Sequence, residues 1–167
     1  MSLLEILTYP DDRLKQISAD IEAIDKDVQQ FIRDLEASRQ AGPGAVGIAA
    51  PQVGVLQRIV IVDVSSTRKP CDNHGHMIMI NPEITQWDGM VMGREGCLSV
   101  PDFTGNVIRA EKIKLNYLDE TGQHHEIEST GFEARAIQHE LDHLDGLLFL
   151  DRLVSRRTDL FARKKYK

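Results

Sequence analysis

The order of the periodic segments constrains the fold more than any other feature of this sequence. Two amphipathic helical segments, residues 25–41 and 132–145, flank a series of short segments with the apolar patterns of β-strands. No strand–helix–strand alternation occurs, so a parallel sheet with crossover helices is not expected. The sequence predicts an α+β fold in which antiparallel β-sheets pack around the second, central helix, with an N-terminal helix and a short C-terminal helix.

The strand-like segments differ in how clearly they can be recognised. Residues 111–118 and 125–130 alternate apolar and polar side chains around a turn at 119–122, which predicts a hairpin. Residues 44–54 are too rich in glycine and alanine for a packed strand, and we interpret them as a segment that another backbone approaches closely. The remaining strands are expected at residues 58–64, 77–81 and 83–92.

The two helices have recognisable ends. A Gly-Pro-Gly sequence at residues 42–44 ends the first helix, and Gly146 ends the second. Thr130 and Glu133 have the spacing of a capping box, in which each side chain satisfies a backbone N–H of the other residue. This pattern predicts that the second helix begins directly after Thr130.

Length and composition exclude several classes of protein. A chain of 167 residues indicates one domain, residues 1–167, and a net charge of −6 argues against DNA binding. No apolar run approaches the ~20 residues that cross a bilayer, and the N-terminus lacks the pattern of a signal peptide. Two cysteines cannot form a disulfide framework. We therefore expect a cytoplasmic protein without a DNA or membrane partner.

Charge is distributed unevenly along the chain. Residues 155–167 contain six basic residues and one acidic residue, a net charge of +5 on an otherwise acidic protein. The simpler interpretation is a solvated C-terminal helix whose cations complement the helix dipole. The alternative is a docking element for an anionic surface such as ribosomal RNA.

The central helix contains an H-E-x-x-H motif. His139 and His143 are separated by one helical turn, so both imidazoles can reach one cation. Glu140 lies beside them and can exchange a proton with a nearby water molecule without binding the metal. The alternative is a solvent-facing helix that carries this pattern by chance, but the apolar stripe of this helix indicates a fixed position against a sheet.

A catalytic metal site of this type usually has a third protein ligand and an open position. The third-ligand position of the metzincin pattern is Phe149, which excludes that class, and no Glu follows the motif. Cys97, in a glycine-flanked segment that we place between strands, is the best candidate, because a thiolate binds borderline metals strongly. The short polar loop with Cys71, His74 and His76 is interpreted as incidental.

Three segments, in chain order, together resemble the motifs of peptide deformylases. They are residues 47–52 (GIAAPQ), 95–99 (EGCLS) and 138–143 (QHELDH). The resemblance extends over nearly the whole chain, apart from the polar loop at residues 71–76 and the last dozen residues. It implies a metal-dependent hydrolase that removes the N-formyl group from the formylmethionine of newly synthesised polypeptides and releases formate.

The resemblance also implies a role for each group of the site. The metal ligands would be Cys97, His139 and His143. The native ion would be Fe²⁺, with Zn²⁺, Ni²⁺ or Co²⁺ able to take its place, whereas the ligand chemistry alone favours zinc. Glu140 would be the general acid and base.

The remaining implied roles concern the substrate. The Gln52 side chain and the Leu98 backbone N–H would lie around the reacting carbonyl oxygen. The substrate-binding residues would include Gly47 and Gly96, because small residues suit an extended peptide between two backbone edges. An apolar pocket for the methionine side chain is expected at Val46, Ala136 and Ile137.

Three positions depart from the pattern of the family. Ala45 replaces the first glycine of the first motif, Thr104 stands where many bacterial members have arginine, and Ile108 stands where they have proline. None of these changes removes a catalytic group, but they bear on how the substrate side chains are recognised.

Two other functions are compatible with the same helix. A small metallopeptidase would cleave unformylated peptides and use a third ligand other than Cys97. A non-catalytic peptide-binding module would have a closed four-ligand metal site and would release no formate.

Overall fold

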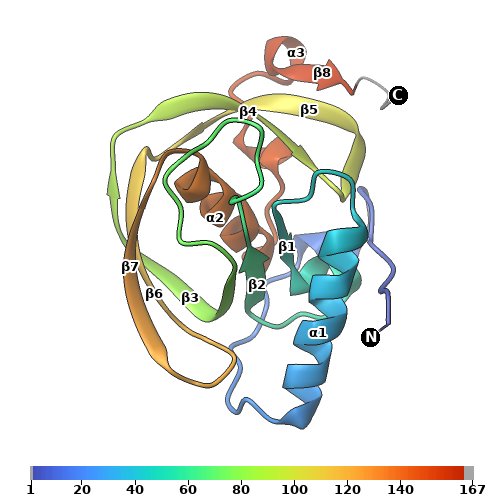
Figure 1. The fold of residues 1–167 in the computed structure, drawn as a ribbon. Helices are drawn as coiled ribbons and strands as arrows, with labels where there is room; N and C mark the ends of the chain where they lie inside the picture. Colours follow the sequence, from blue (N-terminus) through green and yellow to red (C-terminus); the bar gives the residue numbers. More distant parts are fainter. Residues whose placement is uncertain (1, 164–167) are drawn as a thin grey trace.

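A computed structural model describes residues 2–163 as two antiparallel sheets arranged around one central helix (Figure 1). The five-stranded sheet has the order β1-β2-β3-β6-β7, and the three-stranded sheet has the order β4-β5-β8. The strands of the first sheet are β1 (Gly47–Ala49), β2 (Ile59–Val62), β3 (Met77–Asp88), β6 (Lys112–Leu118) and β7 (His124–Thr130). Those of the second are β4 (Val91–Cys97), β5 (Val100–Arg109) and β8 (Leu160–Ala162). The predicted α+β class and antiparallel pairing are confirmed.

The first helix, α1 (Lys26–Ala41), forms where its apolar spacing predicts it. Its N-terminus is capped by Asp25, whose Oδ1 accepts a hydrogen bond from the Val28 N–H at 2.9 Å. Its apolar face covers one side of the five-stranded sheet through a cluster that includes Ile32, Leu35 and Ile48. This packing holds β1 at the edge of that sheet.

The central helix, α2 (Gly131–Leu144), is buried along nearly its whole length. Ile137, Leu141 and Leu144 pack in the core between this helix and the other side of the five-stranded sheet. The predicted capping box is wrong: Thr130 occupies the N-cap, but its hydroxyl makes no capping hydrogen bond within residues 2–163. The Glu133 carboxylate instead accepts hydrogen bonds from Ser129 and from the distant His74, so a tertiary contact has replaced a local one.

Two glycine-containing segments have more regular structure than expected. Residues 47–49, which we considered unsuitable for a packed strand, form the short edge strand β1 and pair with β2. The segment around Cys97, which we placed between strands, is the end of β4 itself. A two-residue turn then leads directly into β5, where Val100 pairs with Cys97. In both cases neighbouring strands supply the backbone hydrogen bonds that local propensity did not indicate.

The chain also contains short helical turns and a longer β3 than predicted. The single-turn helices η1 (Asp12–Lys15), η2 (Ala50–Val53) and η3 (Phe149–Arg152) connect larger elements. Strand β3 joins the predicted strand 77–81 to the first part of the predicted strand 83–92 and has two register irregularities against β6. The predicted limit at residue 92 is wrong, because β3 ends at Asp88 and β4 begins at Val91. None of the described helices is long and apolar enough to cross a lipid bilayer.

The C-terminal segment is only partly helical. The short helix α3 (Arg156–Asp159) confirms a C-terminal helix, but residues 160–162 leave it and form β8 along β5. Three of the basic residues that we assigned to the tail, Lys164, Lys165 and Lys167, lie outside the described residues.

Candidate metal centre

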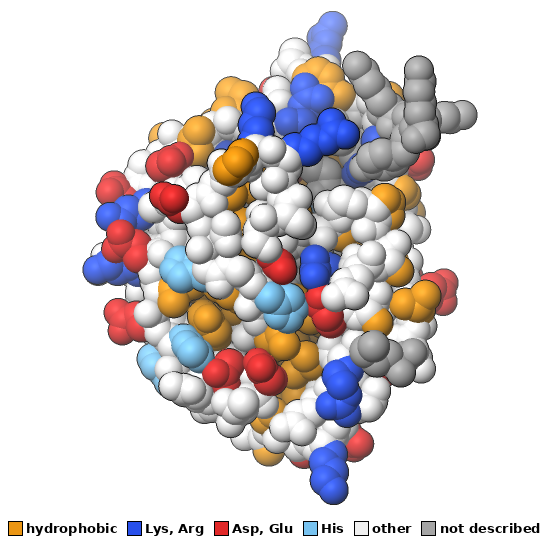
Figure 2. Space-filling model, in the orientation of Figure 1, with side chains coloured by type: hydrophobic (Ala, Val, Ile, Leu, Met, Phe, Trp, Pro, Cys, Tyr) orange, Lys and Arg blue, Asp and Glu red, His pale blue; other side chains and the backbone are white. Residues whose placement is uncertain are grey.

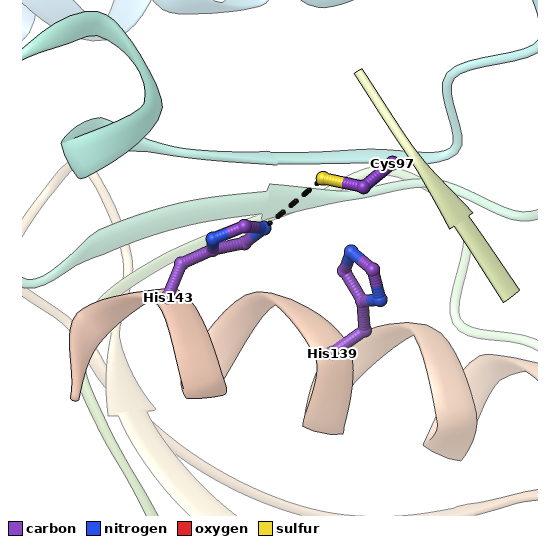
Figure 3. Close-up of side chains that lie close together, drawn as sticks. All are labelled: Cys97, His139 and His143. Atoms are coloured by element: carbon purple, nitrogen blue, oxygen red, sulfur yellow. Dashed lines mark hydrogen bonds between the residues drawn. The ribbon is translucent and has the colours of Figure 1, made fainter. Parts of the chain in front are cut away.

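Three predicted ligand side chains lie together in the interior of the molecule. The ligand atoms of Cys97, His139 and His143 are all within 4.8 Å of one another, and all three residues are buried. They are the only such group of metal-binding side chains within residues 2–163. Figure 3 shows the two imidazoles rising from adjacent turns of α2 toward the Cys97 thiol, which lies 3.4 Å from His143 Nε2.

The strand β4 places the thiol by the alternation of its side chains. Glu95 and Cys97 point inward and are buried, whereas Arg94 and Gly96 point outward. The Cys97 Sγ accepts hydrogen bonds from the Ser99 N–H and from Gln52 Nε2, both at 3.4 Å. Donors of this kind stabilise a thiolate, which is the form of cysteine that binds metals.

Glu95 orients one of the histidines. The His139 Nδ1–H donates a hydrogen bond of 2.8 Å to Glu95 Oε1, so Nε2 is left to face the other ligands. Carboxylate partners of this kind are common behind metal-binding histidines. Burial alone would raise the pKa of Glu95, but hydrogen bonds from Arg109 and His139 outweigh it and hold that pKa well below its usual range.

A buried network of ion pairs lies behind the ligands. Arg109 donates hydrogen bonds to Glu95 and to Asp142, the residue that precedes His143. Arg135 also binds Glu95, and Arg152 binds Asp142. Sequence reasoning assigned no role to these groups. Glu95 and Asp142 stand inside the recognised motifs, which was the one available signal, but nothing local connects them to the arginines.

The protonation of the two histidines differs. Burial lowers the pKa of His143 well below its ordinary value and favours the neutral imidazole that can bind a cation. Burial also opposes a charge on His139, but hydrogen bonds with Cys97 and Glu95 outweigh it and raise the pKa of His139.

Glu140 is a buried carboxylate beside the three candidate ligands, with its Oε1 4.0 Å from His143 Nε2. Burial raises the pKa of its carboxyl group to about 7, against opposing effects of His139 and Arg109. Its Oε1 is buried and has no hydrogen-bond partner within residues 2–163. A Cβ atom at Gly47 would lie 2.5 Å from Glu140 Oε2, so the glycine at this position of β1 makes room for the carboxylate.

Gln52 is held rigidly with its amide directed at the centre. Its Oε1 accepts a hydrogen bond from the Ala49 N–H at 2.9 Å, which fixes the direction of Nε2. Nε2 then lies 3.4 Å from Cys97 Sγ and 3.1 Å from Ser99 Oγ. Leu98 follows Cys97 in the turn between β4 and β5 and lines the same cleft.

A cleft of about 280 Å³ opens from this centre to the surface. All four residues that we expected to bind substrate line it, namely Val46, Gly47, Gly96 and Ala136. Ile137 does not line it, because this side chain points into the core below. The lining also includes four residues to which sequence reasoning assigned no role in binding substrate: Arg94, Phe132, Arg135 and Arg163.

The three departures from the family pattern fall in different places. Ala45 and Thr104 both line the cleft. Ile108 lies outside it, on the part of β5 that pairs with Met92, and its side chain is exposed. Of the three departures, only the first two therefore border the cleft.

The polar loop that we considered incidental forms structural contacts instead of a metal site. His74 is bonded through Nδ1 to Glu133 at 2.6 Å, and His76 pairs with Glu36 of α1 at 3.0 Å. Cys71 packs against the core. The loop thus connects the two helices.

Comparisons with known proteins agree on one family. The family model described as polypeptide deformylase matches residues 3–159. A peptide deformylase from Thermodesulfovibrio yellowstonii is 44% identical over 167 residues, covering 100% of this chain and 98% of that protein. A crystal structure of peptide deformylase from Ehrlichia chaffeensis in complex with actinonin has a TM-score of 0.87 and 36% identity, covering 94% of this chain and 92% of the other. A class I type b peptide deformylase from Acinetobacter baumannii has a TM-score of 0.85 and 39% identity, covering 92% and 100%.

Proposed function

The chain belongs to the polypeptide deformylase family, metal-dependent hydrolases that remove the N-formyl group from nascent peptides, and we propose that Cys97, His139 and His143 bind its metal ion. The donor set fits a divalent transition metal, because one thiolate and two imidazoles suit such ions and leave a coordination position open. When bound, the ion supplies Lewis acidity at the reacting carbonyl and makes water acidic enough to deprotonate near neutral pH. We propose Fe²⁺ as the native ion, with Zn²⁺, Ni²⁺ or Co²⁺ able to replace it.

Glu140 is proposed to move the proton during hydrolysis. A carboxylate oxygen of Glu140 takes a proton from water in the cleft, and the resulting hydroxide attacks the formyl carbon. The same carboxyl group then delivers the proton to the methionine nitrogen as the C–N bond breaks, which releases formate and a free amine. The pKa of about 7 supports this role, because an efficient proton carrier has a pKa close to the working pH.

Gln52 and Leu98 are proposed to stabilise the negative charge that develops on the formyl oxygen. The proposal is supported by the fixed direction of Gln52 Nε2 and by the position of Leu98 in the turn beside Cys97. Donors that are held in place before the reaction need no reorganisation, and loss of one such donor typically costs about 3 kcal/mol of transition-state stabilisation.

The substrate is proposed to bind as an extended strand between β1 and β4. Both are edge strands of their sheets, and Gly47 and Gly96 line the cleft between them. An extended peptide can hydrogen-bond to such edges through its backbone. Val46 and Ala136 would contact the methionine side chain.

The observation that carries this proposal is the position of the buried Glu140 carboxylate, whose Oε1 lies 4.0 Å from His143 Nε2 and accepts no hydrogen bond within residues 2–163. The decisive experiment measures formate release from formyl-Met-Ala-Ser, together with metal analysis of anaerobically purified protein. Cleavage of unformylated peptides would favour a metallopeptidase. Full metal occupancy without formate release would indicate a non-catalytic peptide-binding module.

We further propose that residues 1–167 act as one catalytic domain in the cytoplasm. The continuous match over residues 3–159 supports a single domain, and the need for a reduced Cys97 thiolate supports a reducing compartment.

We propose that the basic tail docks to ribosomal RNA. The proposal is supported by the concentration of charge after residue 155, where Arg156 and Arg157 are exposed. Charge reversal of Lys164 and Lys165 should weaken co-sedimentation with ribosomes at low salt, while hydrolysis of a free formylated tripeptide persists. Equal co-sedimentation of variant and wild type would exclude docking through these residues.

A further inference from the structure

Two arginine side chains stand at the rim of the cleft, and we call Arg94 and Arg163 the basic rim. Arg94 lies on β4 and points outward, on the same face of the strand as Gly96. Both arginines line the cleft together with Thr104, which pairs with Gly96 across the β4–β5 hairpin. The rim therefore borders the path that an extended peptide would follow along β4.

Arg163 reaches this place because the chain returns along β5 as β8. Phe161 pairs with Thr104, and the Arg163 N–H donates a hydrogen bond to Asp102 O at 2.8 Å. A Cβ atom at Gly96 would lie only 2.7 Å from Arg163 Nη2. The guanidinium thus lies directly over the glycine, 3.4 Å from Cys97 O.

Arg94 is held by neutral groups. It donates hydrogen bonds to Asn106 and Thr104, and its guanidinium lies 3.7 Å from the centre of the Phe161 ring. Among residues 2–163, no carboxylate forms an ion pair with Arg94. An exposed cation fixed in this way can still attract an anionic group from the substrate.

The acidic groups of the cleft do not neutralise Arg94. Glu95 and Glu140 are the only carboxylates among the lining residues that the structure describes, and both are buried. Glu95 is already engaged by Arg109 and Arg135. Lys and Arg side chains gather over β4, β5 and α3 in Figure 2, although the whole chain has a net charge of −6.

For a peptide that runs antiparallel to β4, the position of Arg94 along the strand corresponds to one substrate residue. Arg94 precedes Cys97 by three residues, which corresponds to about 10 Å along a strand. Consider a peptide that runs antiparallel to β4 with its formyl carbon beside Cys97. Its third residue then lies about the same distance from Cys97 as Arg94 does.

We infer that the basic rim is a specificity-determining element that favours a carboxylate side chain at the third residue of the formylated peptide. This inference rests on the proposed function. It assigns a binding role to a residue of the C-terminal segment, Arg163, that lies outside all three motifs.

The test compares two substrates of the same shape. Formyl-Met-Ala-Asp-amide and formyl-Met-Ala-Asn-amide differ by one charge, and the terminal amide removes the other carboxylate. The wild type should have a kcat/KM roughly three- to ten-fold higher for the Asp substrate, expressed mainly in KM, because exposed ion pairs contribute modestly. The preference should shrink in about 0.5 M salt.

Arg94→Gln and Arg163→Gln should each reduce this Asp/Asn ratio, and the double variant should bring it close to one. Arg157→Gln is the matched control, because it removes the same charge from an exposed residue of α3 that does not line the cleft. If Arg163→Gln does not fold, Arg94→Gln carries the test alone.

A ratio of one in the wild type, or a ratio that survives the double variant, would overturn the inference. An equal loss in Arg157→Gln would also overturn it, because general charge and not the rim would then be responsible. Absence of formate from both substrates would instead refute the deformylase function.

Discussion

At the scale of single residues, Glu140 is the group whose surroundings match its proposed role most closely. Glu140→Gln should keep the shape of the side chain but remove its ability to accept a proton. We expect kcat for formate release to fall by roughly 10²- to 10⁴-fold, with metal content near one equivalent per chain. Activity above about a tenth of the wild-type value in a fully metallated variant would rule out this role.

The two cysteines provide a matched pair for the metal ligand. Cys97→Ser should lose most of the bound metal and the activity, because a serine hydroxyl is a much weaker ligand than a thiolate. Cys71→Ser should affect neither, since this thiol is half-buried against the core and is not a member of the ligand cluster. The comparison requires the metal content of both variants after dialysis and their rates of formate release. Our ligand assignment would be wrong if Cys71 proved to be the essential thiol.

At the scale of elements, the β6–β7 hairpin depends on one carboxylate in its turn. Asp119 accepts hydrogen bonds from Thr121 Oγ1 at 2.6 Å, from His125 Nε2 at 2.7 Å and from two backbone N–H groups. The bonds from Thr121 and His125 hold the pKa of Asp119 well below its usual range. The carboxylate therefore stabilises the fold above its unfolded pKa of about 3.8, and this contribution is lost as the pH falls below that value.

Asp119→Asn should accordingly lower the free energy of unfolding by about 1 kcal/mol at pH 7, as expected for a few solvent-exposed hydrogen bonds. The difference from the wild type should narrow below about pH 4. Urea unfolding at pH 7 and at pH 3 measures this difference in the free energy of unfolding. Asp72→Asn in the exposed loop is the control for net charge. If Asp119→Asn lowered the free energy of unfolding equally at pH 3 and pH 7, the stabilising role of the Asp119 charge would be contradicted.

At the scale of the whole molecule, the metal centre joins the two sheets. Cys97 belongs to the three-stranded sheet, whereas the two histidines lie on the helix that packs against the five-stranded sheet. A cation bound by all three residues would favour the folded state by mass action, by about 2.7 kcal/mol at a free concentration 100 times Kd. Removal of the metal with a chelator should therefore lower Tm by roughly 5–10 °C.

Scanning calorimetry with and without chelator tests this expectation. Cys97→Ser is the control, because a variant that cannot hold the metal should show no chelator-dependent shift. A wild-type Tm that does not respond to complete metal removal would show that the centre contributes nothing to the cohesion of the two sheets.

Features that depend on local spacing could be predicted from the amino-acid sequence alone. The i, i+4 separation of His139 and His143 places both imidazoles on one face of any helix, whatever surrounds it. The limits of α1 and the β6–β7 hairpin follow in the same way from periodicity and turn residues. The third ligand could be chosen because thiolates are rare and chemically distinctive.

Contacts between residues that are distant in the chain became apparent only in the folded molecule. Glu133 does not form the predicted capping box, because its carboxylate is hydrogen-bonded twice to His74, which is remote in sequence. The pairing of Glu95 with Arg109 and the position of Arg163 at the cleft likewise depend on strand pairing between β4, β5 and β8. Such contacts depend on the register of strands far apart in the chain, and no short window of sequence contains that information.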